Sequence, residues 1–112
     1  MKVSSVLRRT QSGFAHWCPA CKQLHIFTTE GRNHCGAAWN FDGNVEAPTF
    51  TPSMHCSWGG TKDPVDGTEI PREVCHYFLH GGMIQFLGDC THAMAGMTVP
   101  LPPLPPEWVP NN

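Results

Sequence analysis

The sequence predicts a small, mostly β domain, built from short antiparallel strands and hairpins and held together by zinc like a zinc ribbon, with little helix. Eleven glycines and eleven prolines in 112 residues indicate many turns and short strands rather than long helices. Six cysteines and seven histidines supply many potential metal ligands. A chain of this length is expected to form one domain around one small core.

The stretch 75–92, CHYFLHGGMIQFLGDCTH, is the most regular part of the chain and predicts a hairpin. From Cys75 to His80 the residue types alternate with the period of two that a strand requires. The glycine pair that follows is a two-residue turn of the kind that tolerates positive φ, and an apolar strand returns after it. The hairpin therefore brings Cys75 and Cys90, which lie far apart in sequence, to one end.

The motif CPAC at 18–21 offers the other half of a metal site. Two cysteines at this spacing place both sulfurs on one side of a tight turn, an arrangement that zinc sites use repeatedly. We therefore predict a closed, structural Zn²⁺ site made by Cys18, Cys21, Cys75 and Cys90. In the main variant of this site, His76 or His92 replaces one thiolate.

Disulfides are the alternative use of six cysteines. The N-terminal sequence MKVSSVLRRT has no apolar segment of the kind that a secretory signal requires, which favours metal binding in a cytoplasmic protein. Each remaining cysteine, Cys35 and Cys56, follows a histidine, so the two pairs could form a second site. We interpret both instead as free thiols in loops.

The rest of the chain is interpreted from its punctuation by proline and glycine. The segment PTFTPSM at 48–54 is expected to be extended and stiff, and its two prolines argue against a central strand. A single zinc-binding domain over 1–102 is followed by a Pro-rich tail over 103–112. The other expectations are an edge strand or loose arm at 1–12, strands on either side of CPAC, and loops at 30–47 and 57–71.

Three polar residues are the candidates for catalysis. Ser53 follows a proline in the stiff segment, and a serine nucleophile needs a fixed backbone and an adjacent base. His76 and His25 each follow a proposed zinc ligand closely, so the metal would hold both imidazoles rigidly. An imidazole titrates near neutral pH and can take up and return a proton.

The net charge of −2 gives no electrostatic basis for binding nucleic acid. No stretch approaches the length of a membrane span. The sequence does not indicate the oligomeric state.

Several blocks together resemble a known family of small proteins of unknown function: HWCPAC, LHIF, WNFDGN, PTFTPS, CHYFLHGGMIQFLGDCTHAMAG and TVPLP. Its members occur in tailed phages and prophages, and relatives lie beside bacterial ubiquitin-like conjugation genes. The resemblance covers residues 17–102. The matching positions are Cys18, Cys21, His25, Trp39, Pro48, Thr49, Pro52, Ser53, Cys75, His76, Phe78, Asp89, Cys90 and His92.

This resemblance implies a phage-encoded protein of the bacterial cytoplasm that acts as a peptidase on ubiquitin-like proteins. Some relatives in the conjugation operons lack the block DCTH, so the polar set shared by both forms is His25, Ser53 and His76. Cys35, Cys56 and His80 lie outside the family pattern.

Three hypotheses for the function follow from the residues and the resemblance. In the first, the protein is a hydrolase or peptidase in which Ser53 is the nucleophile, His76 is the base, His25 assists and zinc is structural. In the second, it is a zinc-dependent hydrolase with a catalytic metal. In the third, it is a non-enzymatic phage module that binds a protein or peptide partner through its aromatic loop or Pro-rich tail.

Overall fold

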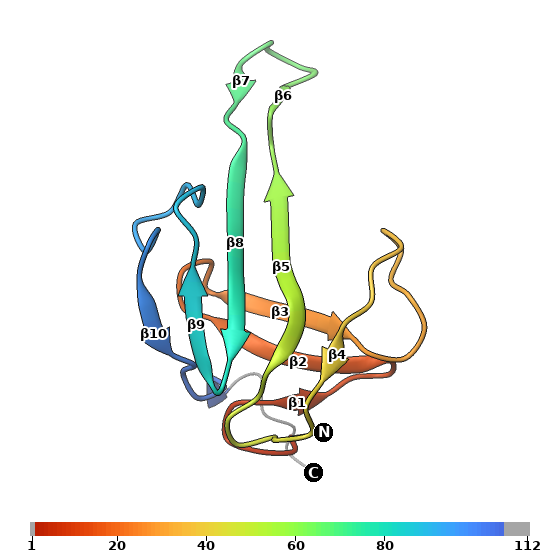
Figure 1. Ribbon diagram of the computed structural model, residues 1–112. Coiled ribbons are helices and arrows are strands. Elements are labelled where there is room, and N and C mark those ends of the chain that lie inside the picture. The colour runs from red at the N-terminus through yellow and green to blue at the C-terminus, as the bar shows by residue number, and fades with distance from the viewer. Residues whose placement is uncertain (1, 107–112) are drawn as a thin grey trace.

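The structure is a computed structural model that describes residues 2–106, and within that range it consists of strands, turns and loops with no α-helix (Figure 1). The strands form antiparallel sheets of three, five and two strands. The prediction of a mostly β fold of short antiparallel strands is thereby confirmed. Within the same range no helix is long and apolar enough to cross a membrane.

The first sheet has the order β1-β2-β3 and contains the CPAC turn. β1 (Arg8–Arg9) is a short edge strand, and β2 (Gly13–Cys18) pairs along its whole length with β3 (Gln23–Thr28). The turn between β2 and β3 closes with Lys22 at a φ of 55°. The expected unit of strand, CPAC turn and strand is therefore present.

The second sheet has the order β10-β9-β8-β5-β4, and its strands β5 and β8 run along the length of the molecule (Figure 1). At its centre β8 (Glu73–His80) and β9 (Met83–Phe86) form the predicted hairpin, joined by the turn Gly81–Gly82 with both φ angles positive. The remaining strands are β4 (Asn40–Phe41), β5 (Phe50–Trp58) and β10 (Thr98–Pro100).

The expectation that two prolines exclude a central strand at 48–54 is wrong. β5 begins at Phe50 and has β4 on one side and β8 on the other. Its register against β8 shifts between Phe50 and Met54, and Pro52 lies inside this irregular stretch. A proline that lacks an N–H is tolerated there, because the regular ladder of hydrogen bonds is already interrupted.

The region 57–71, expected to be a surface loop, contains the end of β5 and a small hairpin. β6 (Thr61–Lys62) pairs with β7 (Glu69–Ile70), and this arm extends beyond the rest of the molecule (Figure 1). All four of its strand residues are exposed, so the arm adds little to the core.

The core lies where the first sheet crosses behind β5 and β8 (Figure 1). The rings of Phe27 on β3 and Phe50 on β5 stack with centroids 4.3 Å apart, and both side chains are buried. Apolar contact of this kind is the main force that joins two sheets. Other fully buried side chains include Leu7, His16, Tyr77, Leu79, Ile84 and Phe86.

The beginning of the Pro-rich tail packs on the domain. The side chain of Leu104 is buried, and its N–H donates to the carbonyl oxygen of Ser5 at 2.8 Å. The boundary predicted at residue 102 stays a prediction, and the part of the tail at 107–112 lies outside the described residues.

Candidate active site and metal centre

Strand β8 carries two groups of polar side chains on opposite faces, because successive residues of a strand point to opposite sides. Cys75 and Tyr77 are fully buried and face the first sheet. His76, between them, is only partly buried and faces the other way. One strand therefore positions both a buried thiol cluster and an accessible imidazole.

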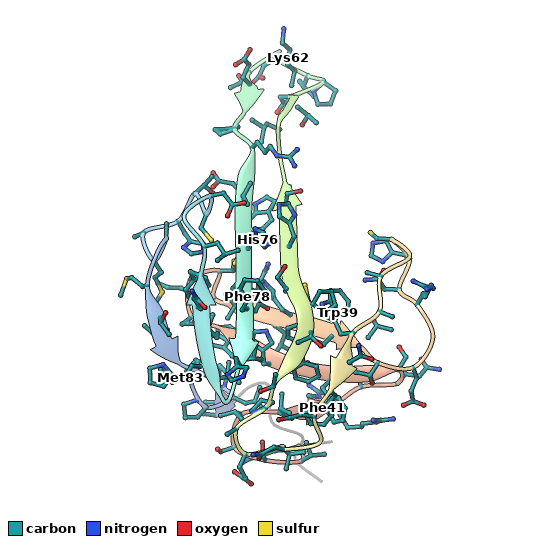
Figure 2. The ribbon with its side chains drawn as sticks, viewed as in Figure 1. Trp39, Phe41, Lys62, His76, Phe78 and Met83 are labelled. Atoms are coloured by element: carbon teal, nitrogen blue, oxygen red, sulfur yellow. The ribbon has the colours of Figure 1, made fainter. Side chains whose placement is uncertain are left out.

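The accessible group is a line of three side chains: Ser53, His76 and Asp89. Ser53 Oγ lies 3.1 Å from His76 Nε2, and Asp89 Oδ2 lies 3.0 Å from His76 Nδ1. The labelled His76 in Figure 2 lies on β8 beside β5, the strand that carries the serine. Both ring nitrogens of the imidazole are thus occupied, one by a hydroxyl and the other by a carboxylate.

Ser53 is placed by the irregular part of β5. The register shift against β8 lies between Phe50 and Met54, so Ser53 belongs to backbone that departs from the regular ladder. The indole N–H of Trp39 donates to the carbonyl oxygen of Ser53 at 3.3 Å. Trp39 is nearly buried, and its ring lies beside β5 (Figure 2), so it supports the serine backbone from the loop before β4.

Asp89 is placed by the two residues that follow it. The backbone N–H of His76 donates to Cys90 Sγ at 3.2 Å, and the same thiol donates to the carbonyl oxygen of His76 at 3.2 Å. Thr91 exchanges backbone and side-chain hydrogen bonds with Val74, one residue before Cys75. The segment 89–91 is thereby held along β8, with its carboxylate beside the imidazole.

The charge arrangement suits activation of the serine. The hydrogen bond from His76 holds the pKa of Asp89 below its usual value, so the carboxylate is ionised at neutral pH. An ionised carboxylate only accepts, so it selects the tautomer that carries a proton on Nδ1. The other nitrogen, Nε2, is then free to accept the proton of the Ser53 hydroxyl.

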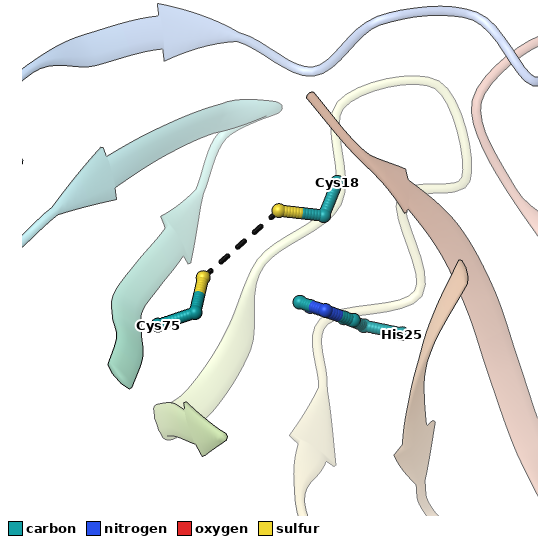
Figure 3. Close-up of side chains that lie close together, drawn as sticks. All are labelled: Cys18, His25 and Cys75. Carbon is teal, nitrogen blue, oxygen red and sulfur yellow. Dashed lines mark hydrogen bonds between the residues drawn. The ribbon is translucent and has the colours of Figure 1, made fainter. Parts of the chain in front are cut away.

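The buried group consists of Cys18, His25 and Cys75, each with a ligand atom within 4.8 Å of the others (Figure 3). The two sulfurs lie 4.0 Å apart. Two thiolates on one tetrahedral zinc ion, each about 2.3 Å from the metal, have sulfurs about 3.8 Å apart. The three side chains therefore fit a tetrahedral metal ion.

The orientation of the His25 ring also fits a metal ligand. His25 Nδ1 lies 2.9 Å from the hydroxyl of Tyr77, which lies 2.6 Å from His16 Nε2. The other nitrogen, Nε2 of His25, is buried without a hydrogen-bond partner. A metal-ligating imidazole commonly donates its second N–H to a neighbouring group, and here Tyr77 occupies that position. Burial lowers the pKa of His25 to about 4, so the ring is neutral, as ligation requires.

Cys21 is not one of the three residues whose ligand atoms lie within 4.8 Å of one another, but its thiol interacts with those of Cys18 and Cys75. A hydrogen bond from Cys75 lowers the pKa of Cys18 to about 6. Burial first, and then the nearby Cys18 thiolate, raise the pKa of Cys21 to about 12. Cys56 lies on β5 opposite Cys75 and not in a loop as expected, and burial followed by the charge of Cys18 raises its pKa too. Once Cys18 is ionised, its negative charge opposes ionisation of the neighbouring thiols. A divalent cation bound to the cluster would stabilise several thiolates at once.

The structure separates the residues that the sequence predicted for the two sites. It brings Ser53 and His76 together, but it places His25 with the thiols of Cys18 and Cys75. It places the Cys90 thiol on the backbone of His76, outside the buried group of ligand atoms. Cys75 faces the core from β8, whereas Cys90 lies on the segment that runs beside β8, where its thiol is bonded to the backbone of His76.

Asp89 is the site residue that the sequence argument did not select. Its signal was present in the block DCTH, which was set aside because some relatives lack it. Only the fold of 87–91 against β8 brings this carboxylate to His76. His55, opposite His76 in the strand register, was likewise not selected, and its ring centroid lies 5.0 Å from that of His76.

A groove with a volume of about 740 Å³ opens beside Ser53. One wall is the segment 52–57 of β5, and the opposite wall is β3 at residues 24–26. The loop at 32–39, which ends at Trp39, completes the lining. Ser53 thus lines a space that can hold a chain segment.

A serine, a histidine and an aspartate in one hydrogen-bonded line define the arrangement of serine-type hydrolases. The chain belongs to the family described as bacterial ubiquitination-like system serine protease (BubE), which matches residues 2–87. The match includes Ser53, His76 and His25 and ends two residues before Asp89. Searches of curated proteins and of solved structures gave no match.

The family membership makes this chain a serine protease of a bacterial ubiquitination-like system, with proteins as its substrates. The family membership therefore confirms the expected relationship to proteins of bacterial ubiquitin-like conjugation systems. Of the three functional hypotheses, the family membership supports the serine-type peptidase.

Proposed function

We propose that Ser53, His76 and Asp89 form the catalytic triad of this protease and that its substrates are ubiquitin-like proteins. Ser53 is the nucleophile, His76 is the general base and Asp89 orients the imidazole. The observation that carries the proposal is the unbroken line of contacts, with 3.1 Å from Ser53 to His76 and 3.0 Å from His76 to Asp89. An imidazole within hydrogen-bond reach of a hydroxyl is the requirement for a serine nucleophile.

The reaction follows from these positions. Ser53 Oγ attacks the substrate carbonyl carbon while its proton passes to His76 Nε2, and the carbonyl oxygen becomes an oxyanion. The carbon–nitrogen bond then breaks, and His76 gives the proton to the leaving amine. A water molecule next gives a proton to His76 and attacks the acyl-serine ester. Collapse of that intermediate returns the proton to Ser53 and releases the acid.

In this proposal the metal has a structural role. Cys18, Cys21, His25 and Cys75 would hold one Zn²⁺ ion, which would supply a rigid cross-link between the CPAC turn and β8. Four protein ligands close the site to water, as in other structural zinc sites. The ligand His25 replaces the predicted Cys90. The proposed ligand Cys75 and the proposed base His76 point to opposite faces of β8, which supports separate roles for the two groups.

The test is covalent labelling by a fluorophosphonate, a small reagent that reacts with activated serines. The wild-type protein should be labelled at Ser53, and Ser53→Ala and His76→Ala should both prevent labelling. Asp89→Asn should slow it by roughly two to four orders of magnitude, because the asparagine supports the wrong imidazole tautomer. Asp63→Asn, which changes a carboxylate in the exposed arm, is the matched control.

Zinc content and thermal melting should be unchanged in all these variants. A wild-type protein that cleaves a ubiquitin-like substrate but resists the reagent, and loses activity in Cys18→Ser while still folded, would instead place catalysis at the metal. Labelling of the wild type at a different serine would also contradict the proposed triad.

A further inference from the structure

We propose, on the basis that Ser53 is the nucleophile, that the open edge of β3 binds an extended segment of the protein substrate as an additional strand. The segment would form backbone hydrogen bonds with Leu24 and Ile26, and so lie along the groove beside Ser53. The ligand is thus an unfolded stretch of polypeptide next to the scissile bond.

The backbone groups of β3 alternate between its paired side and its open side. β3 is the last strand of its sheet, with β2 on one side only. The carbonyl oxygen of Thr28 accepts a hydrogen bond at 2.8 Å from the N–H of Trp39, which does not belong to β2. The backbone groups of Thr28 therefore point to the side of β3 that faces away from β2. The N–H and C=O groups of a strand residue point to the same side as those of residues two and four positions away. Ile26 and Leu24 therefore direct their backbone donors and acceptors away from β2.

Trp39 connects this open edge to the nucleophile. Its backbone N–H bonds to Thr28 at the end of β3, and its indole N–H bonds to the carbonyl oxygen of Ser53 at 3.3 Å. Leu24, Ile26 and Ser53 all line the same groove. A chain paired with the two β3 residues would therefore occupy the groove that Ser53 lines.

The edge of β3 also lacks the features that usually protect an exposed strand edge. Such edges are commonly blocked by a proline, a bulge or a charged side chain. The centre of β3, Leu24–Ile26, contains none of these, its register with β2 is continuous, and Ile26 is 49% exposed. An open, apolar edge next to a nucleophile is suited to the addition of a strand from a ligand.

The composition of the groove indicates which segments it accepts. Among the described residues that line it, none is acidic, and Arg32 and His34 lie on its loop wall. A neutral or acidic extended segment therefore suits the groove better than one rich in lysine or arginine. Backbone pairing reads no side chain, so specificity comes from alternate residues that face the walls.

The test uses alanine-based peptidyl phosphonates, which react with activated serines at a rate that depends on how the peptide binds. A pentapeptidyl phosphonate should inactivate the wild-type protein faster than the corresponding single-residue reagent. Methylation of one peptide N–H at a time should slow inactivation at alternate positions only, because every second N–H faces β3. Each sensitive position should lose about three- to tenfold in rate, the size expected for one hydrogen bond.

Variants of β3 provide an independent measurement. Ile26→Pro removes an N–H that faces the open side, so no bond to β2 is lost. It should slow the pentapeptidyl reagent three- to tenfold and leave labelling by the small fluorophosphonate unchanged. Ile26→Val keeps the N–H and is the matched control, and zinc content and melting show that both variants fold.

The outcomes separate this inference from the proposed triad. Failure of every reagent to label Ser53 in the wild type would contradict the triad, and with it the substrate strand. If the small fluorophosphonate labels Ser53 normally but the pentapeptidyl reagent reacts no faster than the single-residue reagent, the binding of substrate along β3 is contradicted and the triad is not. Equal rates of the pentapeptidyl reagent with Ile26→Pro and Ile26→Val would lead to the same conclusion.

Discussion

At the scale of single residues, the segment 89–91 shows how three neighbouring side chains perform three different tasks. Asp89 contacts the His76 ring, the Cys90 thiol contacts the His76 backbone, and Thr91 bonds to Val74. All three act on the same short stretch of β8. The segment therefore fixes the position and the hydrogen bonding of the imidazole together.

We predict that Cys90→Ala lowers the rate of Ser53 labelling by about tenfold without loss of zinc. The thiol bonds to both backbone groups of His76, so its removal releases the segment that carries Asp89. Cys90→Ser, which keeps a donor and an acceptor, should recover most of the rate. Zinc analysis of both variants checks the assignment, since loss of the metal from Cys90→Ala would restore Cys90 to the ligand set.

A second prediction concerns His55, His76 and Asp89, which also have potential ligand atoms within 4.8 Å of one another. Zn²⁺ added in excess over the structural ion should slow Ser53 labelling. Metal bound at His76 Nδ1 breaks the contact with Asp89, and metal at Nε2 prevents proton transfer from Ser53. His55→Ala should need at least tenfold more Zn²⁺ for half-inhibition, measured against its own metal-free rate. Equal sensitivity in His34→Ala and His55→Ala would exclude this site.

At the scale of elements, the close approach of β2 and β3 supports the buried group of Cys18, His25 and Cys75. β2 supplies Cys18 and β3 supplies His25, so the spacing of this pair determines the geometry of the ligands. Gly13, at the start of β2, lies against the backbone of β3. A Cβ atom built on Gly13 would lie 2.0 Å from the carbonyl oxygen of Phe27, a distance that forces the strands to move.

We therefore predict that Gly13→Ala destabilises the protein by roughly 2–3 kcal/mol or more, as overpacking against rigid backbone does. Gly88→Ala is the control, because a Cβ atom there meets nothing within 4 Å and its φ is not in the left-handed region. Denaturant unfolding of the zinc-bound proteins measures the difference. Similar free energies of unfolding for the two variants would show that β2 and β3 separate at little cost.

At the scale of the whole molecule, the buried thiol cluster lies between the two sheets. Cys18 belongs to the first sheet and Cys75 to the second, so one ion bound to both would cross-link them. A chain of this size has a small core, and native proteins of any size are only marginally stable. The metal is therefore expected to contribute a large part of the folding free energy.

Removal of the metal by a strong chelator should largely unfold the protein and abolish Ser53 labelling. Structural zinc contributes roughly 10–16 kcal/mol of apparent binding energy in small finger peptides, comparable to the whole stability of a domain. Cys75→Ser should have the same effect, whereas Cys35→Ser, at an exposed thiol, should have none. Circular dichroism and zinc analysis before and after chelation check this, and an unchanged cooperative melt without metal would refute it.

The sequence by itself determined the elements whose signals are local. The alternation from Cys75 to His80 and the glycine pair after it predicted the β8–β9 hairpin, because strand period and turn chemistry depend on neighbouring residues only. The CPAC spacing predicted a pair of neighbouring thiols for the same reason. The pairing of Ser53 with His76 was also expected, and it stays a prediction as a catalytic unit.

Only the tertiary structure decided how the remaining polar residues divide between the two groups. Nothing local distinguishes His25 as a neighbour of the thiols from His25 as a partner of Ser53, since that depends on which face of β3 meets β8. The same holds for Asp89 and Cys90, whose positions follow from the path of 87–91 along β8. Pro48 and Pro52 led to the wrong expectation for β5, because the break in the ladder that accommodates Pro52 is a property of two paired strands.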